Sequence, residues 1–164
     1  MTRPSTLLYL DQNYLSGIAK RKPAFAELEP VLRRAVESGA VAVPESEIHA
    51  VEAAPRPDLG LLELLRELSG GRRLEPGPEA AAIERRLGRA IEEELPARRG
   101  RRGDALDLRA LAAALPACRL VTCDAFMADV VRRTRLDRRY GCELFTGRRA
   151  DVRLLRDRLL DLLR

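Results

Sequence analysis

Aromatic residues are scarce in this sequence, and tryptophan is absent. Aromatics make up 4% of the 164 residues, whereas hydrophobic residues as a group make up 46%. The interior must therefore be built mainly from leucine, valine, isoleucine and alanine. A chain of this length can bury such a core without disulfides or metals, and it fits one domain spanning residues 1–164.

Cysteine is also scarce, and long apolar runs are absent. Cys118, Cys123 and Cys142 are an odd number without metal-site spacing, so we expect reduced thiols in the core. No apolar run approaches the roughly 18 residues that a membrane span requires, and the N-terminus does not resemble a signal peptide. These absences predict a cytoplasmic protein without a membrane partner.

Lysine is nearly absent, although the chain is basic. Lys20 and Lys22 are the only lysines among 30 basic residues, and the net charge is +5. A basic balance permits an anionic partner such as nucleic acid. An excess of arginine, alanine and leucine is also what a GC-rich coding bias produces, so charge alone favours nucleic acid only mildly.

Short apolar stretches without alternation predict strands that are buried on both faces. They lie at 6–10, 40–43 and 119–123, with a fourth short strand at 143–145. Helical patterns fill the intervals at 14–20, 25–36, 47–54, 59–68, 80–95, 105–115, 126–133 and 151–164, with a loop at 96–103 and a helix break at Pro116. Strands that alternate with helices predict an α/β fold, a three-layer α/β/α sandwich around a central, mostly parallel sheet.

Acidic residues occur where the predicted strands end. Asp11 follows the first strand and Asp124 the third, Asp107 opens the helix before the third strand, and Glu52 lies in the helix after the second. Because the carboxyl ends of parallel strands meet at one edge of a sheet, the four side chains are expected to converge there. The alternative for Asp11 is that it only caps the next helix.

Converging carboxylates repel one another and are costly to bury unless a cation lies between them. Oxygen ligands suit Mg²⁺ or Mn²⁺ rather than zinc. Such a site can polarise a phosphoryl oxygen and activate water for attack on phosphorus. The sequence therefore predicts one or two divalent ions held by Asp11, Glu52, Asp107 and Asp124.

These acids lie in segments that carry a family resemblance: LYLDQN at 8–13, PESEIHAVE at 44–52 and DALDLRALAAALPACRLVTCD at 104–124. Their order and spacing resemble the successive motifs of PIN-domain nucleases, over residues 6–146. The resemblance implies a small α/β/α fold that cuts RNA with three or four acidic residues and Mg²⁺ or Mn²⁺. Many such proteins are toxins of toxin–antitoxin pairs, so an antitoxin protein is an expected partner, and a homodimer is left open.

The resemblance assigns roles residue by residue. Asp11 matches the first-strand aspartate and Asn13 the polar residue two positions later, whereas Gln12 replaces a small hydroxyl residue that is common in the family. Glu52 matches the helix glutamate, six residues after the serine at the strand end, Ser46.

The last motif leaves one choice open. Asp124 matches the acid two residues after the strand-end threonine, Thr122. Asp104 and Asp107 lie three apart on one helical face, and either could be the ligand. Asp107 is favoured because the apolar positions that follow it match better, which leaves Asp104 as a helix N-cap or an auxiliary ligand.

Several neighbours of the acids have two interpretations each. Thr122 could contact Asp124 or a phosphate, and Ser46 could cap a helix or bind a metal-bound water. His49, the only histidine, could orient Glu52 or touch substrate, or it could be an ordinary surface or partly buried residue. Four arginines precede the acidic helix and could contact a phosphate backbone or simply be solvated; they are Arg98, Arg99, Arg101 and Arg102.

Together these features predict a metal-dependent ribonuclease of the PIN type that acts on RNA. A catalytically silent PIN-like module that binds RNA or protein is the main alternative, and it is disfavoured because all four acids are present. A flavodoxin-like phosphoacceptor domain is a further alternative. The absence of a lysine after a late strand argues against it.

Overall fold

Four strands form one parallel sheet at the centre of the fold. The computed structural model describes residues 5–94 and 102–164. The strand order is β2-β1-β3-β4, and each pairing of neighbours is parallel. The strands are β1 (Thr6–Tyr9), β2 (Val41–Ala42), β3 (Leu120–Thr122) and β4 (Glu143–Phe145). The predicted α/β class and all four predicted strand positions are confirmed.

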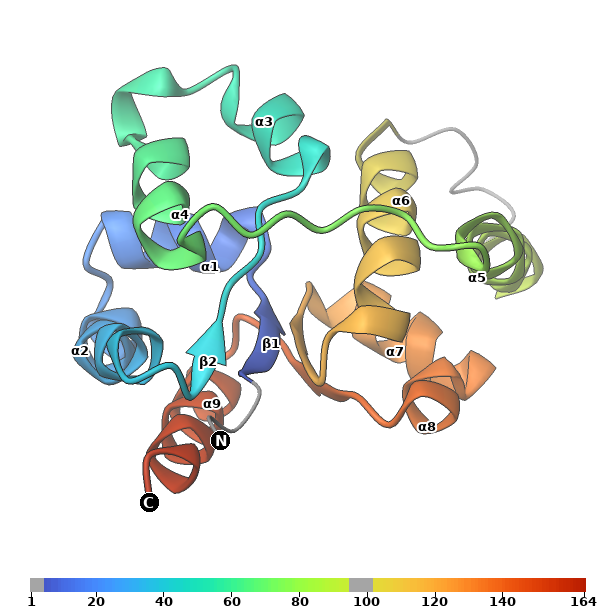
Figure 1. Cartoon of the computed structure of the whole chain (residues 1–164). Coiled ribbons are helices and arrows are strands. Elements are labelled where there is room, and N and C mark those ends of the chain that lie inside the picture. Colours follow the sequence, from blue (N-terminus) through green and yellow to red (C-terminus); the bar gives the residue numbers. More distant parts are fainter. Residues whose placement is uncertain (1–4, 95–101) are drawn as a thin grey trace.

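Helices cover both faces of this sheet, as Figure 1 shows. One layer contains α1, α2, α4 and α9, and the other contains α5, α6, α7 and α8. The helices are α1 (Gln12–Ala19), α2 (Pro23–Glu37), α3 (Glu47–Ala53), α4 (Leu61–Ser69), α5 (Ala80–Glu94), α6 (Arg102–Ala117), α7 (Ala125–Thr134), α8 (Leu136–Tyr140) and α9 (Arg149–Leu162). The result is the predicted three-layer arrangement.

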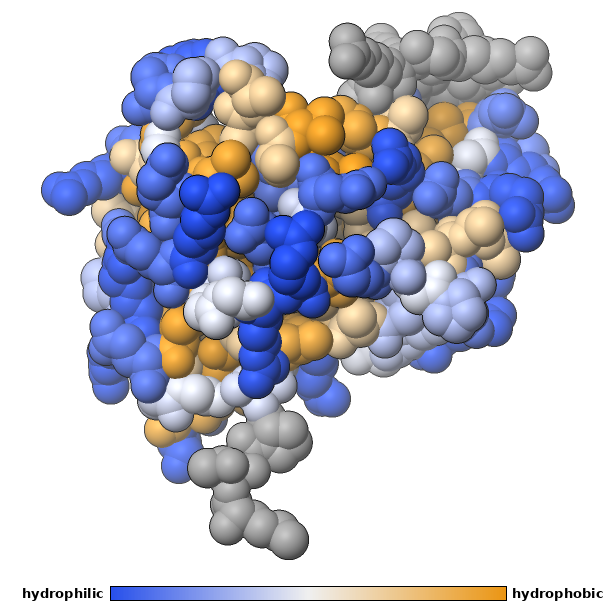
Figure 2. Space-filling model, turned by 45° about the horizontal axis from the view of Figure 1, so that its top comes forward, coloured by the Kyte–Doolittle hydropathy of each residue, from blue (hydrophilic) through white to orange (hydrophobic). Residues whose placement is uncertain are grey.

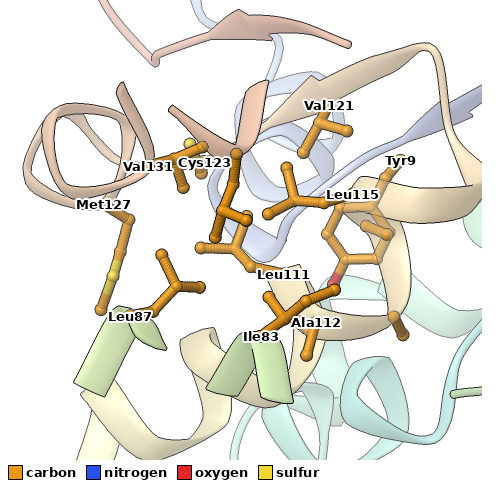
Figure 3. Close-up of a cluster of buried hydrophobic side chains, with 14 of the residues drawn as sticks. Tyr9, Ile83, Leu87, Leu111, Ala112, Leu115, Val121, Cys123, Met127 and Val131 are labelled. Carbon is orange, nitrogen blue, oxygen red and sulfur yellow. The ribbon is translucent and has the colours of Figure 1, made fainter. Parts of the chain in front are cut away.

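The core lies on both sides of the sheet because successive strand residues point to opposite faces. Leu8 and Leu10 pack in the layer with α1 and α2, whereas Tyr9 between them packs in the layer with α5 and α6. Figure 3 shows the second layer, in which Leu115 of α6 lies beside Val121 of β3 and Met127 of α7 lies beside Leu87 of α5. As expected, the three cysteines are buried and free.

The structure corrects four details of the predicted elements. α6 begins at Arg102, three residues before the predicted start, so Asp104 lies inside its first turn and is not an N-cap. Asp107 correspondingly lies inside α6 rather than at its opening. Pro116 does not break the helix, which continues to Ala117. α8 was not predicted; it is five residues long and lies between Arg135 and Gly141, which both have positive φ.

None of the described helices is both long and apolar enough to cross a membrane.

Candidate active site

Asp11 and Asp124 lie side by side at the carboxyl edge of the sheet, because β1 and β3 are neighbours. Each is the N-cap of the helix that follows its strand. Asp11 Oδ1 accepts the N–H of Tyr14 at 3.3 Å, and Asp124 Oδ1 accepts the N–H of Met127 at 2.7 Å. Within the described residues, the Oδ2 atom of neither aspartate accepts a hydrogen bond. Asp11 therefore both caps α1 and lines the cleft, two roles that the sequence left as alternatives.

Thr122 holds Asp11 through two hydrogen bonds. The Asp11 N–H donates to Thr122 Oγ1 at 2.8 Å, and the Thr122 hydroxyl donates to Asp11 Oδ1 at 2.8 Å. Asp124 and a phosphate are the partners that the sequence predicts for Thr122; in the described part of the chain its hydroxyl contacts Asp11 rather than Asp124, and the phosphate contact stays a prediction. The reason is the register of β1 and β3: Tyr9 pairs with Val121, which places Thr122 beside the residue before Asp11.

Glu52 reaches the same edge on α3. The Gln12 side chain donates from Nε2 to the Glu52 carbonyl oxygen at 2.8 Å, which ties the first turn of α1 to α3. Sequence reasoning noted Gln12 only as a departure from the family pattern and gave it no role. Because this contact depends on how two helices meet, sequence spacing alone could not have identified it.

His49 and Ser46 attach the start of α3 to the end of β1. The Ser46 N–H donates to His49 Nδ1 at 3.0 Å, so Nδ1 carries no proton and Nε2–H donates to the Leu10 carbonyl at 2.6 Å. Burial lowers the pKa of His49, which favours this neutral form. Both residues are buried, and neither is among the residues that line the acidic cleft described below. The contacts of Ser46 and His49 therefore position α3, and Ser46 is the N-cap of this helix as predicted.

α6 forms the wall opposite α3. Asp107 and Leu106 line the cleft from this side, whereas Asp104, one turn earlier, is not among the lining residues. An ion pair of 3.0 Å between Arg109 of α6 and Glu47 of α3 also joins the two helices at the surface. The preference for Asp107 over Asp104 therefore agrees with the geometry of the cleft.

The four predicted acids line one open cleft of about 490 Å³. Its remaining lining residues are Gln12, Asn13, Val51, Pro55 and Leu106. A smaller pocket that shares the acids extends inward to Tyr9, Thr122 and Cys123. Of the four predicted substrate-binding arginines, Arg98, Arg99 and Arg101 lie outside the described residues, and Arg102 is the first residue of α6.

Burial and mutual repulsion raise the pKa values of two of the acids. Burial raises the pKa of Asp11 to about 6; the neighbouring Asp124 adds to the rise, whereas the hydrogen bonds from Thr122 and Tyr14 oppose it. Burial also raises the pKa of Glu52 to about 7, with further contributions from Asp107 and Asp11. At neutral pH the metal-free cleft therefore binds protons that separate carboxylates in water would have released.

The donor set fits a hard divalent cation. Every predicted ligand is a carboxylate, which is the ligand type that Mg²⁺ and Mn²⁺ prefer. In the part of the chain that the structure describes, no three histidine, cysteine, aspartate or glutamate side chains already surround a common point closely enough to hold an ion. A divalent cation between the carboxylates would neutralise their repulsion.

A scan of protein-family models found no match, and searches of curated proteins and of solved structures found none either.

Proposed function

We propose that this chain is a Mg²⁺- or Mn²⁺-dependent ribonuclease with a PIN-like site. The observation that carries the proposal is the convergence of Asp11, Glu52, Asp107 and Asp124, from four separate segments, in one cleft at the carboxyl edge of a parallel sheet. Clefts at this edge are where open α/β folds bind their ligands. The resemblance to PIN-domain nucleases at the same residues supports RNA as the substrate.

The four carboxylates would hold the ion or ions. A bound divalent cation polarises a phosphoryl oxygen and lowers the pKa of a coordinated water. The chain itself holds two of these carboxylates through hydrogen bonds: Thr122 and the Tyr14 N–H hold Asp11, and the Met127 N–H holds Asp124. Gln12 binds the backbone carbonyl of Glu52 and so ties α3, which carries Glu52, to α1.

The test is cleavage of a labelled oligoribonucleotide by wild type and by Asp11→Asn, with Mn²⁺ or with EDTA. Asparagine keeps the shape of aspartate and its capping oxygen but removes a charge that the ion requires. We expect cleavage by wild type with Mn²⁺, none with EDTA, and none by the variant. Asp129→Asn is the matched control, because Asp129 is an exposed acid of α7 in an ion pair with Arg133.

An equally active Asp11→Asn enzyme, or cleavage that survives EDTA, would refute the proposal. A wild type that binds RNA without cutting it would instead favour the silent RNA-binding module.

A further inference from the structure

The rim of the acidic cleft carries three apolar side chains beside the polar Gln12 and Asn13. Val51 and Pro55 line it on the α3 side, and Leu106 lines it on the α6 side. Val51 is one of two large hydrophobic side chains that stand out as exposed in the described part of the chain, at 48%; the other is Leu154, at 51%. In Figure 2, which brings this edge of the molecule forward, hydrophobic surface shows between hydrophilic groups in the upper middle of the view.

A metal site does not by itself require an apolar rim. Exposed apolar groups beside converging polar groups are typical of pockets that bind a small molecule or one unit of a polymer. The cleft volume of about 490 Å³ lies within the range of such pockets. The ligand should therefore have an anionic part that a cation can bridge to the acids and an apolar part that covers Val51 and Leu106.

A nucleotide has both parts. Its phosphate is anionic, and its base has two flat faces that lose contact with water when they are covered. Enzymes that take a base out of its stack commonly hold it against aromatic or apolar side chains. Aromatic side chains are absent from the lining residues of this open cleft, so the aliphatic rim is the surface available for a base.

We propose that Val51, Pro55 and Leu106 form a seat for one unstacked nucleobase adjacent to the phosphate held at the acids. This inference rests on the proposed ribonuclease function and adds a determinant of substrate choice. A base inside a duplex is stacked on both faces and can reach the seat only by leaving the helix.

The experiment combines a protein variant with a substrate variant. Val51→Ser removes apolar surface from the seat, and Leu154→Ser is the matched control, since Leu154 lies on α9, outside the cleft lining, and has nearly the same exposure. The substrates are a single-stranded oligoribonucleotide with one cleavage site and two copies that lack the base on one or the other side of it. For each pair, RNA affinity is measured by fluorescence anisotropy and kcat/KM by cleavage with Mn²⁺.

We expect removal of one of the two bases to lower wild-type affinity and kcat/KM by about 5-fold, the low end of the range for base stacking on an aromatic side chain, because the seat is aliphatic. Val51→Ser should lose a similar factor on intact RNA and lose nothing more on the abasic RNA. Leu154→Ser should behave like wild type on every substrate. This pattern would show that Val51 and the base contact each other.

Other patterns would overturn the seat. One is an equal abasic penalty in wild type and Val51→Ser; another is Val51→Ser with wild-type affinity and rate on intact RNA. The second result would instead favour a protein partner at the rim. A lysine or arginine side chain of such a partner could cover Val51 with its apolar stem. Failure of the ribonuclease proposal is separate: RNA binding with the expected pattern but without cleavage would keep the seat and reject the enzyme.

Discussion

Replacing Asp11 with asparagine should stabilise the metal-free protein at neutral pH, although it removes a charge proposed to be essential. The folded protein raises the Asp11 pKa from 3.8 to about 6, so below pH 3.8 the carboxyl is protonated in both the folded and the unfolded state. As the pH rises to about 6, the unfolded state gives up its proton more readily, and stability falls through this window. Above it, the penalty is constant.

The size of the effect follows from the shift. One pK unit corresponds to about 1.4 kcal/mol, so the rise of the Asp11 pKa from 3.8 to about 6 can destabilise the folded state by at most about 3 kcal/mol. Asp11 is partly exposed, and water screens its charge, so we expect the substitution to raise the free energy of unfolding by about 1–2 kcal/mol at pH 8. Asparagine Oδ1 can still accept from Thr122 and from the α1 N–H.

The assay is urea unfolding of wild type and Asp11→Asn in EDTA, at pH values from 3.5 to about 8, with the window set by the Asp11 shift. The two proteins should agree within about 0.5 kcal/mol at the acidic end, as expected for a substitution that breaks no contact, and diverge as the pH rises. At 100 times its dissociation constant, Mn²⁺ should stabilise wild type by about 2.7 kcal/mol and the variant by less. Asp129→Asn should show no comparable gain, because Asp129 is exposed.

A variant that is less stable than wild type at pH 8 would refute this reasoning. So would parallel stability curves, because they would mean that the folded state does not raise the pKa of Asp11.

Three further changes test other contacts. Gln12→Met removes the donor to the Glu52 carbonyl while keeping the side-chain length, so it should lower the free energy of unfolding by about 1 kcal/mol. It should also weaken Mn²⁺ binding severalfold in calorimetry. An unchanged Mn²⁺ affinity would show that the contact does not position Glu52. Gly17→Ala should destabilise the protein by about 1–3 kcal/mol in urea unfolding, although alanine has the higher helix propensity, because the added Cβ would lie 2.6 Å from the Phe25 ring. Adding Phe25→Leu to this variant should restore part of the lost stability. Changing the four arginines before Asp104 to glutamine should flatten the salt dependence of RNA affinity by up to about 3 log–log units, and parallel lines would mean that they are only solvated; they are Arg98, Arg99, Arg101 and Arg102.

The sheet and the convergence of the acids could be predicted because they depend on local patterns and one general rule. Continuous apolar stretches identify buried strands, and parallel strands place their carboxyl ends at one edge. Asp11 and Asp124 follow two such strands, so their meeting required only that β1 and β3 be neighbours. The positions of Glu52 and Asp107 were harder to predict, because the position of a helical residue depends on how its helix packs.

The partners of individual side chains could not be predicted for the same reason. The bond between Thr122 and Asp11 depends on a register between strands more than 100 residues apart, which no local pattern encodes. His49 had two plausible roles until the tertiary contact with Leu10 showed that both ring nitrogens are engaged. α8 was missed because five residues are too few for a clear helical period.

The contact between Asp11 and Thr122 also has a consequence for biosynthesis. It joins residues 111 positions apart, so the site is complete only after β3 has been synthesised and has docked beside β1. Non-local strand pairing of this kind forms slowly, because a long loop must close before any contact is gained. A growing chain that ends before β3 therefore carries Asp11, Glu52 and Asp107 but lacks the strand that orients the first of them. Any activity of the cleft should therefore appear only after the segment through Asp124 has left the ribosome.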